Sequence, residues 1–337
     1  MKKTNKPAKV FILLGEGNMV GKGQIYGKDE GTLEYAVHTK KRFTHLVDFN
    51  SDWRINSKVR FVGVHNDGFD VYRNEWLGVH DRTSFGPELQ FGYIMGEVLD
   101  DGEDPDDASS PILIIKSASE RQDLGGYLLP PGSHSYQHGD FTYAGYGGSP
   151  RRWKTGKQKD ASRFRAGIQY DTVVTNVKAI LNDIRTYSPE SSNSEYTIEG
   201  FVWWHGDSDR RMSAYADRYE KNLVSLIESL RYDLQAPQAK FVVATLGQDG
   251  ENMEGDTLRV TEAQMAMGNN KKYSQFEGNV AVADIRSSWR GAHLPGHSGN
   301  DKKSDDAHYG RNAETVMEVG NAVGLAMAKL LLEGRDE

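Results

Sequence analysis

The sequence predicts an α/β protein with a parallel sheet, helices on both of its faces, and one long loop insertion. Three observations support this fold class: short continuous apolar runs, amphipathic stretches between them, and a composition of many glycines (36) and few prolines (10). The apolar runs are typical of strands buried on both faces, as in a parallel sheet. They occupy residues 10–14, 112–115, 201–203, 241–245 and 280–283.

The stretches between these runs carry apolar residues at helical spacing, at residues 173–184, 219–230 and 316–330. Strands that alternate with amphipathic helices favour a parallel sheet covered on both faces. Ligands of such sheets bind beyond the carboxyl ends of the strands. We therefore expect the functional residues in the loops that follow the apolar runs.

Length and composition exclude several classes of protein. A chain of 337 residues, 37% of them hydrophobic, can bury one large core, and we expect a single domain over residues 1–337. The net charge of −7 argues against a nucleic-acid partner, and the glycine spacing fits no nucleotide-binding loop. The absence of cysteine excludes thiol nucleophiles and thiolate metal sites. The composition leaves the oligomeric state open.

The hydropathy pattern gives expectations for membrane association and for the cellular compartment of the protein. No apolar run approaches the ~20 residues of a membrane span, so we expect no membrane partner. The first apolar stretch, residues 10–14, is too short for the core of a signal peptide. We expect a periplasmic or secreted protein if a signal peptide has been removed, and a cytoplasmic protein otherwise.

Residues 125–160 are rich in Gly, Pro, Tyr and Arg and are long for a structureless connection. We interpret this segment as a functional insertion or a lid. Its aromatic side chains fit two interpretations, stacking on sugar rings or simple packing of the loop. They are Tyr127, Tyr136, Tyr143, Tyr146 and Trp153.

Four sequence blocks, in order along the chain, carry a resemblance to a known family. They are residues 10–21 (VFILLGEGNMVG), 86–92 (GPELQFG), 200–209 (GFVWWHGDSD) and 305–308 (DDAH). In the same order they resemble a block with the core G-Q-S-N-M, a helix start, the block W-x-Q-G-E-x-D and the block D-x-x-H of the sialate O-acetylesterase-like family of SGNH hydrolases. The resemblance implies the flavodoxin-like SGNH fold, a carbohydrate substrate and no cofactor; the runner-up is another flavodoxin-like fold.

The departures from the family concern its chemistry. Its serine attacks an acetyl ester while the histidine of D-x-x-H takes the proton and the aspartate orients that histidine. The resemblance gives the last two roles to His308 and Asp305, but Gly17 stands at the serine position and cannot form an acyl-enzyme. Ser119, Glu120 and Arg121 stand where the family has a Trp-Gly-Gly segment that supplies an oxyanion donor. We therefore do not expect a conventional serine esterase.

The candidate site consists of polar and aromatic residues expected at neighbouring strand ends. The candidate catalytic residues are His308, Asp305, Glu16, His205 and Glu120. The candidate substrate-binding residues are Arg121, Asn18, Gly17, Trp204 and Asp207.

Most of these residues also fit a structural interpretation. His205 follows two tryptophans and could be a buried, hydrogen-bonded histidine. Asp207 could cap the helix expected near Ser213. Arg121 could hold a carboxylate or sulfate in a bidentate way or be an ordinary surface charge, and the loop carboxylates could simply be solvated. Ligand type would allow a metal on His205, Asp207 and His308, but without a His-x-x-His spacing we expect none.

Three functions remain open. The first is cleavage of an anionic or acetylated polysaccharide by non-serine acid/base chemistry. This would be hydrolysis with paired carboxylates or β-elimination with Arg121 on a uronate. The second is a residual O-acetylesterase in which His308 activates water. The third is a non-catalytic glycan-binding protein that kept the fold.

Overall fold

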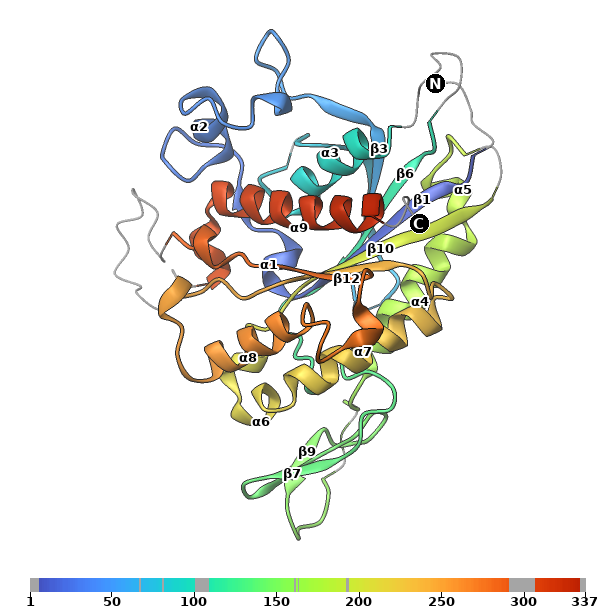
Figure 1. Cartoon of the computed structure of the whole chain (residues 1–337), viewed down its shortest axis with the longest axis vertical. Coiled ribbons are helices and arrows are strands. Elements are labelled where there is room, and N and C mark those ends of the chain that lie inside the picture. The colour runs from blue at the N-terminus through green and yellow to red at the C-terminus, as the bar shows by residue number, and fades with distance from the viewer. Residues whose placement is uncertain are drawn as a thin grey trace.

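The computed structural model describes residues 6–333 except 67, 81, 101–108, 161, 163, 192–193 and 291–306, and it leaves the side chains of residues 307 and 308 undescribed. A seven-stranded sheet runs through the molecule in the order β12-β11-β10-β1-β6-β3-β4 (Figure 1). All neighbouring strands are parallel except β3 and β4. The strands are β1 (Ala8–Gly15), β3 (Ile55–Val64), β4 (Val71–Gly78), β6 (Ile112–Ala118), β10 (Tyr196–Trp204), β11 (Lys240–Ala244) and β12 (Val280–Ala283).

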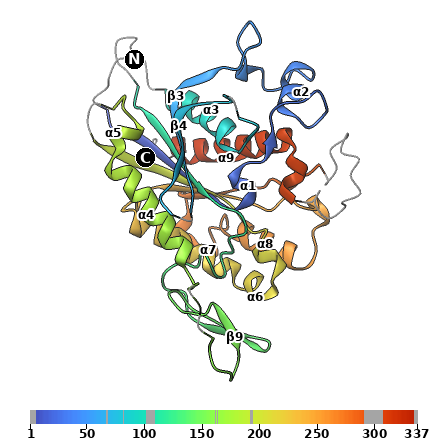
Figure 2. The same ribbon diagram turned by 180° about the vertical axis from the view of Figure 1, so that it is seen from behind.

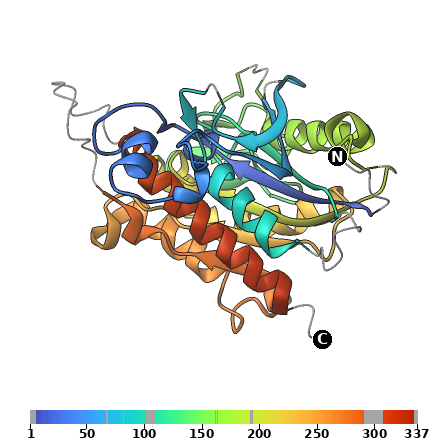
Figure 3. The same cartoon turned by 90° about the horizontal axis from the view of Figure 1, so that it is seen from above.

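Helices cover both faces of this sheet, as Figure 3 shows from above. One face carries α4 (Ile168–Asn182), α5 (Ile184–Tyr187), α7 (Tyr219–Asp233) and α8 (Gly255–Ala266). The other carries α3 (Glu88–Val98) and α9 (Ala313–Glu333). This arrangement confirms the predicted α/β class, and each of the five apolar runs forms a strand of the sheet.

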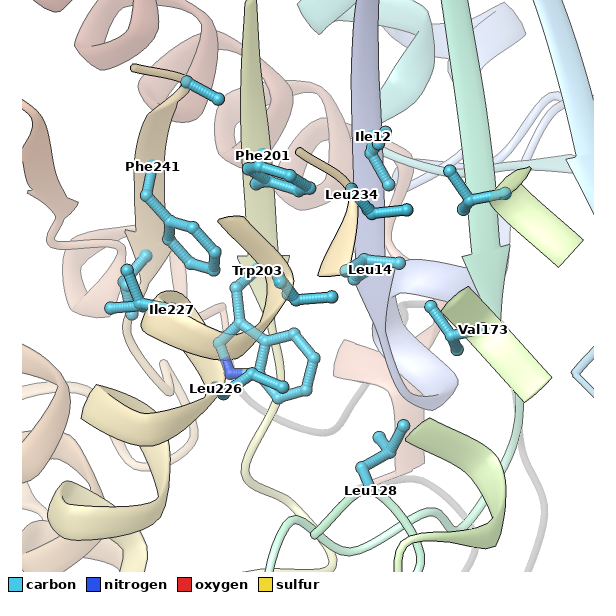
Figure 4. Packing of buried hydrophobic residues seen from close by; sticks show 14 of the residues in the cluster. Ile12, Leu14, Leu128, Val173, Phe201, Trp203, Leu226, Ile227, Leu234 and Phe241 are labelled. Carbon is cyan, nitrogen blue, oxygen red and sulfur yellow. The ribbon is translucent and has the colours of Figure 1, made fainter. Parts of the chain in front are cut away.

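The central strand β1 shows why the sequence folds in this way. Ile12 and Leu14 enter the hydrophobic cluster that includes Trp203 and Leu226, seen in Figure 4. Phe11 and Leu13 enter the cluster on the opposite face. Successive side chains of a strand point to opposite faces, so a continuous apolar run fills both clusters. Each fully buried side chain of this kind contributes about 1.5–3 kcal/mol to folding.

Strands β3 and β4 were not predicted. β3 begins with exposed polar residues and becomes buried only toward its carboxyl end, and β4 is the edge strand with an alternating pattern. Neither therefore presents one long apolar run. Short elements complete the fold: α1 (Gly17–Val20), β2 (Gly23–Gln24), α2 (Leu33–His38), η1 (Thr44–Leu46), β5 (Ser84–Phe85), η2 (Asp209–Arg211), α6 (Ser213–Ala216), η3 (Gly250–Asn252), η4 (Ser274–Phe276), η5 (Arg286–Ser288) and η6 (Ala307–Arg311).

The insertion is a small antiparallel sheet of β7 (Tyr136–His138), β8 (Phe141–Tyr143) and β9 (Arg152–Lys154). It projects from the body in Figures 1 and 2. Tyr143 is buried between Tyr136, with ring centroids 5.1 Å apart, and Tyr215, at 5.6 Å. Tyr146 packs on Tyr170. The packing interpretation therefore holds for these tyrosines.

Helix α9 is the one described helix that is long and apolar enough to cross a membrane, with 21 residues and a mean hydropathy of 1.4. This differs from the expectation that no such run exists. The helix is nevertheless a core element, because 61% of that stretch is buried. A Cβ at Gly320 would lie 2.6 Å from the Pro87 carbonyl oxygen, so α9 lies almost directly against the start of α3.

Candidate functional site

The candidate site is built by loops that follow three neighbouring strands, β6, β1 and β10. The carboxyl ends of these parallel strands meet at one edge of the sheet. The last residue of β1, Gly15, lies so close to β10 that a Cβ there would be 2.1 Å from the Trp204 carbonyl oxygen. Only glycine fits this approach, and it brings the loops after β1 and β10 into contact.

Glu16 joins these two loops. Its side chain is buried, and its Oε1 accepts hydrogen bonds from the backbone N–H groups of Gly206 (2.9 Å) and Ser208 (3.0 Å). Its Oε2 accepts a bond from the Ser208 hydroxyl. With both oxygens occupied, the carboxylate is arranged to hold the loops together, which favours a structural over a catalytic role.

We expect Glu16→Gln to change the free energy of unfolding by less than about 1 kcal/mol. The amide oxygen can still accept from the two backbone N–H groups, and the amide nitrogen can donate to the Ser208 hydroxyl. Urea unfolding would measure this, and acetate release would be followed in parallel. A loss of activity of about 10²-fold or more without loss of stability would instead identify Glu16 as a catalytic acid or base.

His205 is fully enclosed. Its Nε2 lies 2.5 Å from the Gln122 carbonyl oxygen, which can only accept, so Nε2 donates this hydrogen bond; its Nδ1 lies 3.2 Å from the Tyr219 hydroxyl. That hydroxyl in turn accepts from Trp203 Nε1 and Gln264 Nε2. The imidazole stacks on the Trp203 ring, with centroids 4.4 Å apart. These contacts favour the interpretation of His205 as a buried, hydrogen-bonded histidine.

Asp209 is the most deeply buried carboxylate of the site. Its two oxygens accept from the backbone N–H groups of Leu124 and Gly125, both at 2.8 Å, and so fasten the loop after β6 to the loop after β10. Burial, together with the neighbouring carboxylates Asp123 and Glu16, raises its pKa well above the ordinary value. Burial also raises the pKa of Asp123, against the opposing effect of the Arg151 guanidinium 3.3 Å away.

Asp207 is partly exposed and forms ion pairs with Arg210 at 2.8 Å and Arg211 at 2.9 Å. Both partners belong to η2, and the N-cap of the helix at Ser213 is Met212 without a side-chain hydrogen bond. The interpretation of Asp207 as a cap of that helix is therefore wrong. Trp204 is buried against Tyr309, with ring centroids 5.3 Å apart, and presents little surface to a ligand.

Gly17 and Asn18 follow the end of β1 as the first two residues of α1, and their predicted contact with a substrate stays a prediction. Gly17 is the buried first residue of α1, and its backbone is helical and therefore accessible to any L-residue. Asn18 is buried beside it. No side chain of this pair can act as a nucleophile.

Glu120 and Arg121 form an exposed turn after β6. Glu120 lies 3.0 Å from Lys22, and Arg121 adopts a left-handed backbone conformation with φ of 56°. Both residues therefore lie at the surface of the candidate site and not among its buried polar groups. Asp305 lies outside the described residues, and so does the side chain of His308, so their predicted roles stay predictions.

A polar pocket of about 360 Å³ adjoins this edge of the sheet, between β3, β6 and the segment after α1. Buried Lys116 on its wall lies 2.8 Å from Glu88 and donates to the Val20 carbonyl at 2.9 Å. Arg82, also buried, pairs with Glu75 and lies above the Phe61 ring. These cations are neutralised by the protein's own carboxylates.

Sequence reasoning missed the residues that hold the site together. They are buried or half-buried polar groups that complete hydrogen bonds within and between the loops and the elements beside them: Asn66, Ser117, Gln122, Asp123, Asp209, Tyr219 and Gln264. One signal was present, because Asp209 is the final residue of the block that resembles W-x-Q-G-E-x-D. The others come from separate segments and carry no local pattern.

The sheet order and the helices on both faces define an α/β fold with a mostly parallel sheet, which is consistent with the SGNH-type fold expected from the sequence. The family model described as carbohydrate esterase, sialic acid-specific acetylesterase, matches residues 142–276, less than half of the chain. No curated protein sequence matches the chain significantly. Over this segment the chain is similar to carbohydrate esterases.

Two solved structures have a fold similar to that of this chain. A protein from Arabidopsis thaliana is similar with a TM-score of 0.51 at 19% identity, covering 97% of this chain and 99% of the other. A carbohydrate acetylesterase from Xanthomonas citri is similar with a TM-score of 0.51 at 12% identity, covering 96% of this chain. This chain spans 57% of the Xanthomonas protein. At these identities the likeness concerns the fold alone.

Proposed function

We propose that the protein hydrolyses O-acetyl esters of a carbohydrate with water in place of the missing serine oxygen. The observation that carries this proposal is Gly17, which occupies the nucleophile position of the resembled family within a site whose loops remain firmly connected. The family match to carbohydrate esterases supports the substrate class.

The reaction balances without a covalent intermediate. Water attacks the acetyl carbon, and His308, oriented by Asp305 as the resemblance implies, takes the proton of that water. The bond between the acetyl carbon and the sugar oxygen breaks, and the sugar oxygen receives the proton from His308. The products are acetate and a free sugar hydroxyl.

Cleavage of an anionic polysaccharide at its glycosidic bonds is the second candidate, and the exposed Arg121 favours it. Hydrolysis would need a carboxylate free to exchange protons. Glu16 has both oxygens hydrogen-bonded, so Glu120 is the better placed partner, although it lies beside Lys22. This geometry supports ester hydrolysis better than glycosidic cleavage.

Product analysis by mass spectrometry tests the proposal. The protein and its His308→Ala variant would be incubated with acetylated xylan, acetylated sialate and uronate-containing polysaccharides. We expect acetate and deacetylated, intact chains from the wild type and neither from the variant. Shortened or unsaturated oligosaccharides would support the second candidate. Saturable binding of unchanged glycans would identify a binding protein that kept the esterase fold.

A further inference from the structure

The outer part of the insertion, together with the six residues that follow it, carries a charge opposite to that of the rest of the protein. Residues 132–166, here called the basic arm, contain seven cationic side chains and two acidic ones, a net charge of +5. The whole chain has a net charge of −7, so the remainder carries −12. Such a separation of charge concentrates positive potential on one small projecting element.

Four cations of the basic arm are exposed on β9 and the segment after it. Within the part of the chain that the structure describes, none of the four forms an ion pair, whereas Arg151 and Arg165 of the same arm pair with carboxylates. Neighbouring like charges repel each other, so their accumulation is unfavourable without an anionic partner. The four residues are Arg152, Lys154, Lys157 and Lys159.

Aromatic rings lie beneath two of these cations. The Arg152 guanidinium is 5.3 Å from the centroid of the Phe141 ring, and Lys159 Nζ is 4.0 Å from that of Trp153. Phe141 is exposed and Trp153 half-buried. Cations next to partly exposed rings suit a polymer that has both anionic groups and apolar ring faces, as acidic sugars do.

The base of the arm is joined to the candidate site. Arg151 pairs with Asp123 at 3.3 Å and lies over the Tyr127 ring at 3.6 Å. Asp123 belongs to the loop after β6 that also carries Arg121, and Asp209 fastens the next residues of that loop. The arm therefore projects from the same edge of the sheet as the site (Figure 1).

We propose that the basic arm binds the carboxylate or sulfate groups of an anionic polysaccharide and holds this polymer beside the candidate site. The inference rests on the proposed function for the carbohydrate nature of the ligand. The family match begins within β8 and includes β9 with the four exposed cations. The net negative charge of the rest of the chain opposes close approach of a polyanion elsewhere.

The test measures binding of fluorescently labelled heparin, alginate, dextran and duplex DNA by fluorescence anisotropy. The salt concentration would be about 0.1 M, at which the Debye length is about 10 Å. The arm variant changes four exposed cations to glutamate: Arg152→Glu, Lys154→Glu, Lys157→Glu and Lys159→Glu. The matched control makes the same charge change on the exposed surface of the body: Lys28→Glu, Lys178→Glu, Lys221→Glu and Lys271→Glu.

We expect the wild type to bind heparin or alginate but not dextran, and the arm variant to bind at least 10-fold more weakly while the body variant changes less than about 3-fold. Binding of heparin but not of alginate would show that sulfate is required, and binding of alginate would show that a carboxylate is sufficient. Equal losses in the two variants, or tighter binding of DNA than of either polysaccharide, would overturn the proposal. The assay needs no turnover, so its failure is distinct from failure of the esterase proposal, which acetate release measures.

Discussion

Replacing Gly17 by serine is expected to raise acetate release from acetylated carbohydrates by about 10²-fold or more. Serine would supply the nucleophile at the position that it has in the resembled family, and His308 would take its proton. The backbone of Gly17 is helical, a conformation that any L-residue adopts. Acetate would be measured enzymatically with wild type and variant at equal concentration.

Two controls make this result interpretable. Gly17→Ala adds a Cβ without a hydroxyl and should not raise the rate, and Gly17→Ser combined with His308→Ala should lose the gain. A properly folded Gly17→Ser variant with unchanged acetate release would show that the remaining groups no longer form an esterase site. It would then favour glycan binding or glycosidic cleavage, which the mass-spectrometric assay distinguishes.

Replacing Asp209 by alanine is expected to lower the free energy of unfolding by about 2–4 kcal/mol. The variant leaves the buried N–H groups of Leu124 and Gly125 without their acceptor, and each unsatisfied buried donor costs about 1–3 kcal/mol. Urea unfolding followed by tryptophan fluorescence would measure the difference.

Asp207→Ala is the matched control, because this carboxylate lies two residues away but is partly exposed and, among the described residues, its ion pairs are those with Arg210 and Arg211. Surface pairs of this kind contribute about 0–1 kcal/mol. If the two alanine variants lost equal stability, the proposed role of Asp209 in fastening the loops would be wrong.

The pH dependence of stability provides a second measurement on Asp209. Its pKa is raised in the folded protein from the ordinary value of 3.8, mainly by burial, so the folded state binds this proton more tightly than the unfolded chain. The contribution of this group to the free energy of unfolding therefore falls as the pH rises from about 3.8 through the raised pKa. Asp209→Asn should remove this component, and an unchanged pH profile would contradict the assignment.

Much of the fold could be predicted because its signals are local. Each of the five apolar runs became a strand, since a strand buried on both faces needs apolar side chains at every position. β3 and β4 lack such a run of apolar residues. The first half of β3 is largely exposed, and β4 lies at the edge of the sheet. Their pairing depends on the neighbouring strand β6 rather than on their own pattern.

The sequence by itself determined the α/β class, the absence of a side chain at position 17 and the charge of the insertion, because residue type and spacing express these directly. Only the tertiary structure decided the roles of the carboxylates. Glu16 and Asp209 proved to be buried acceptors between loops, whereas Asp207 and Glu120 pair with cations at the surface. The backbone N–H groups that bind the first two come from segments far apart in the chain, and folding alone brings them together.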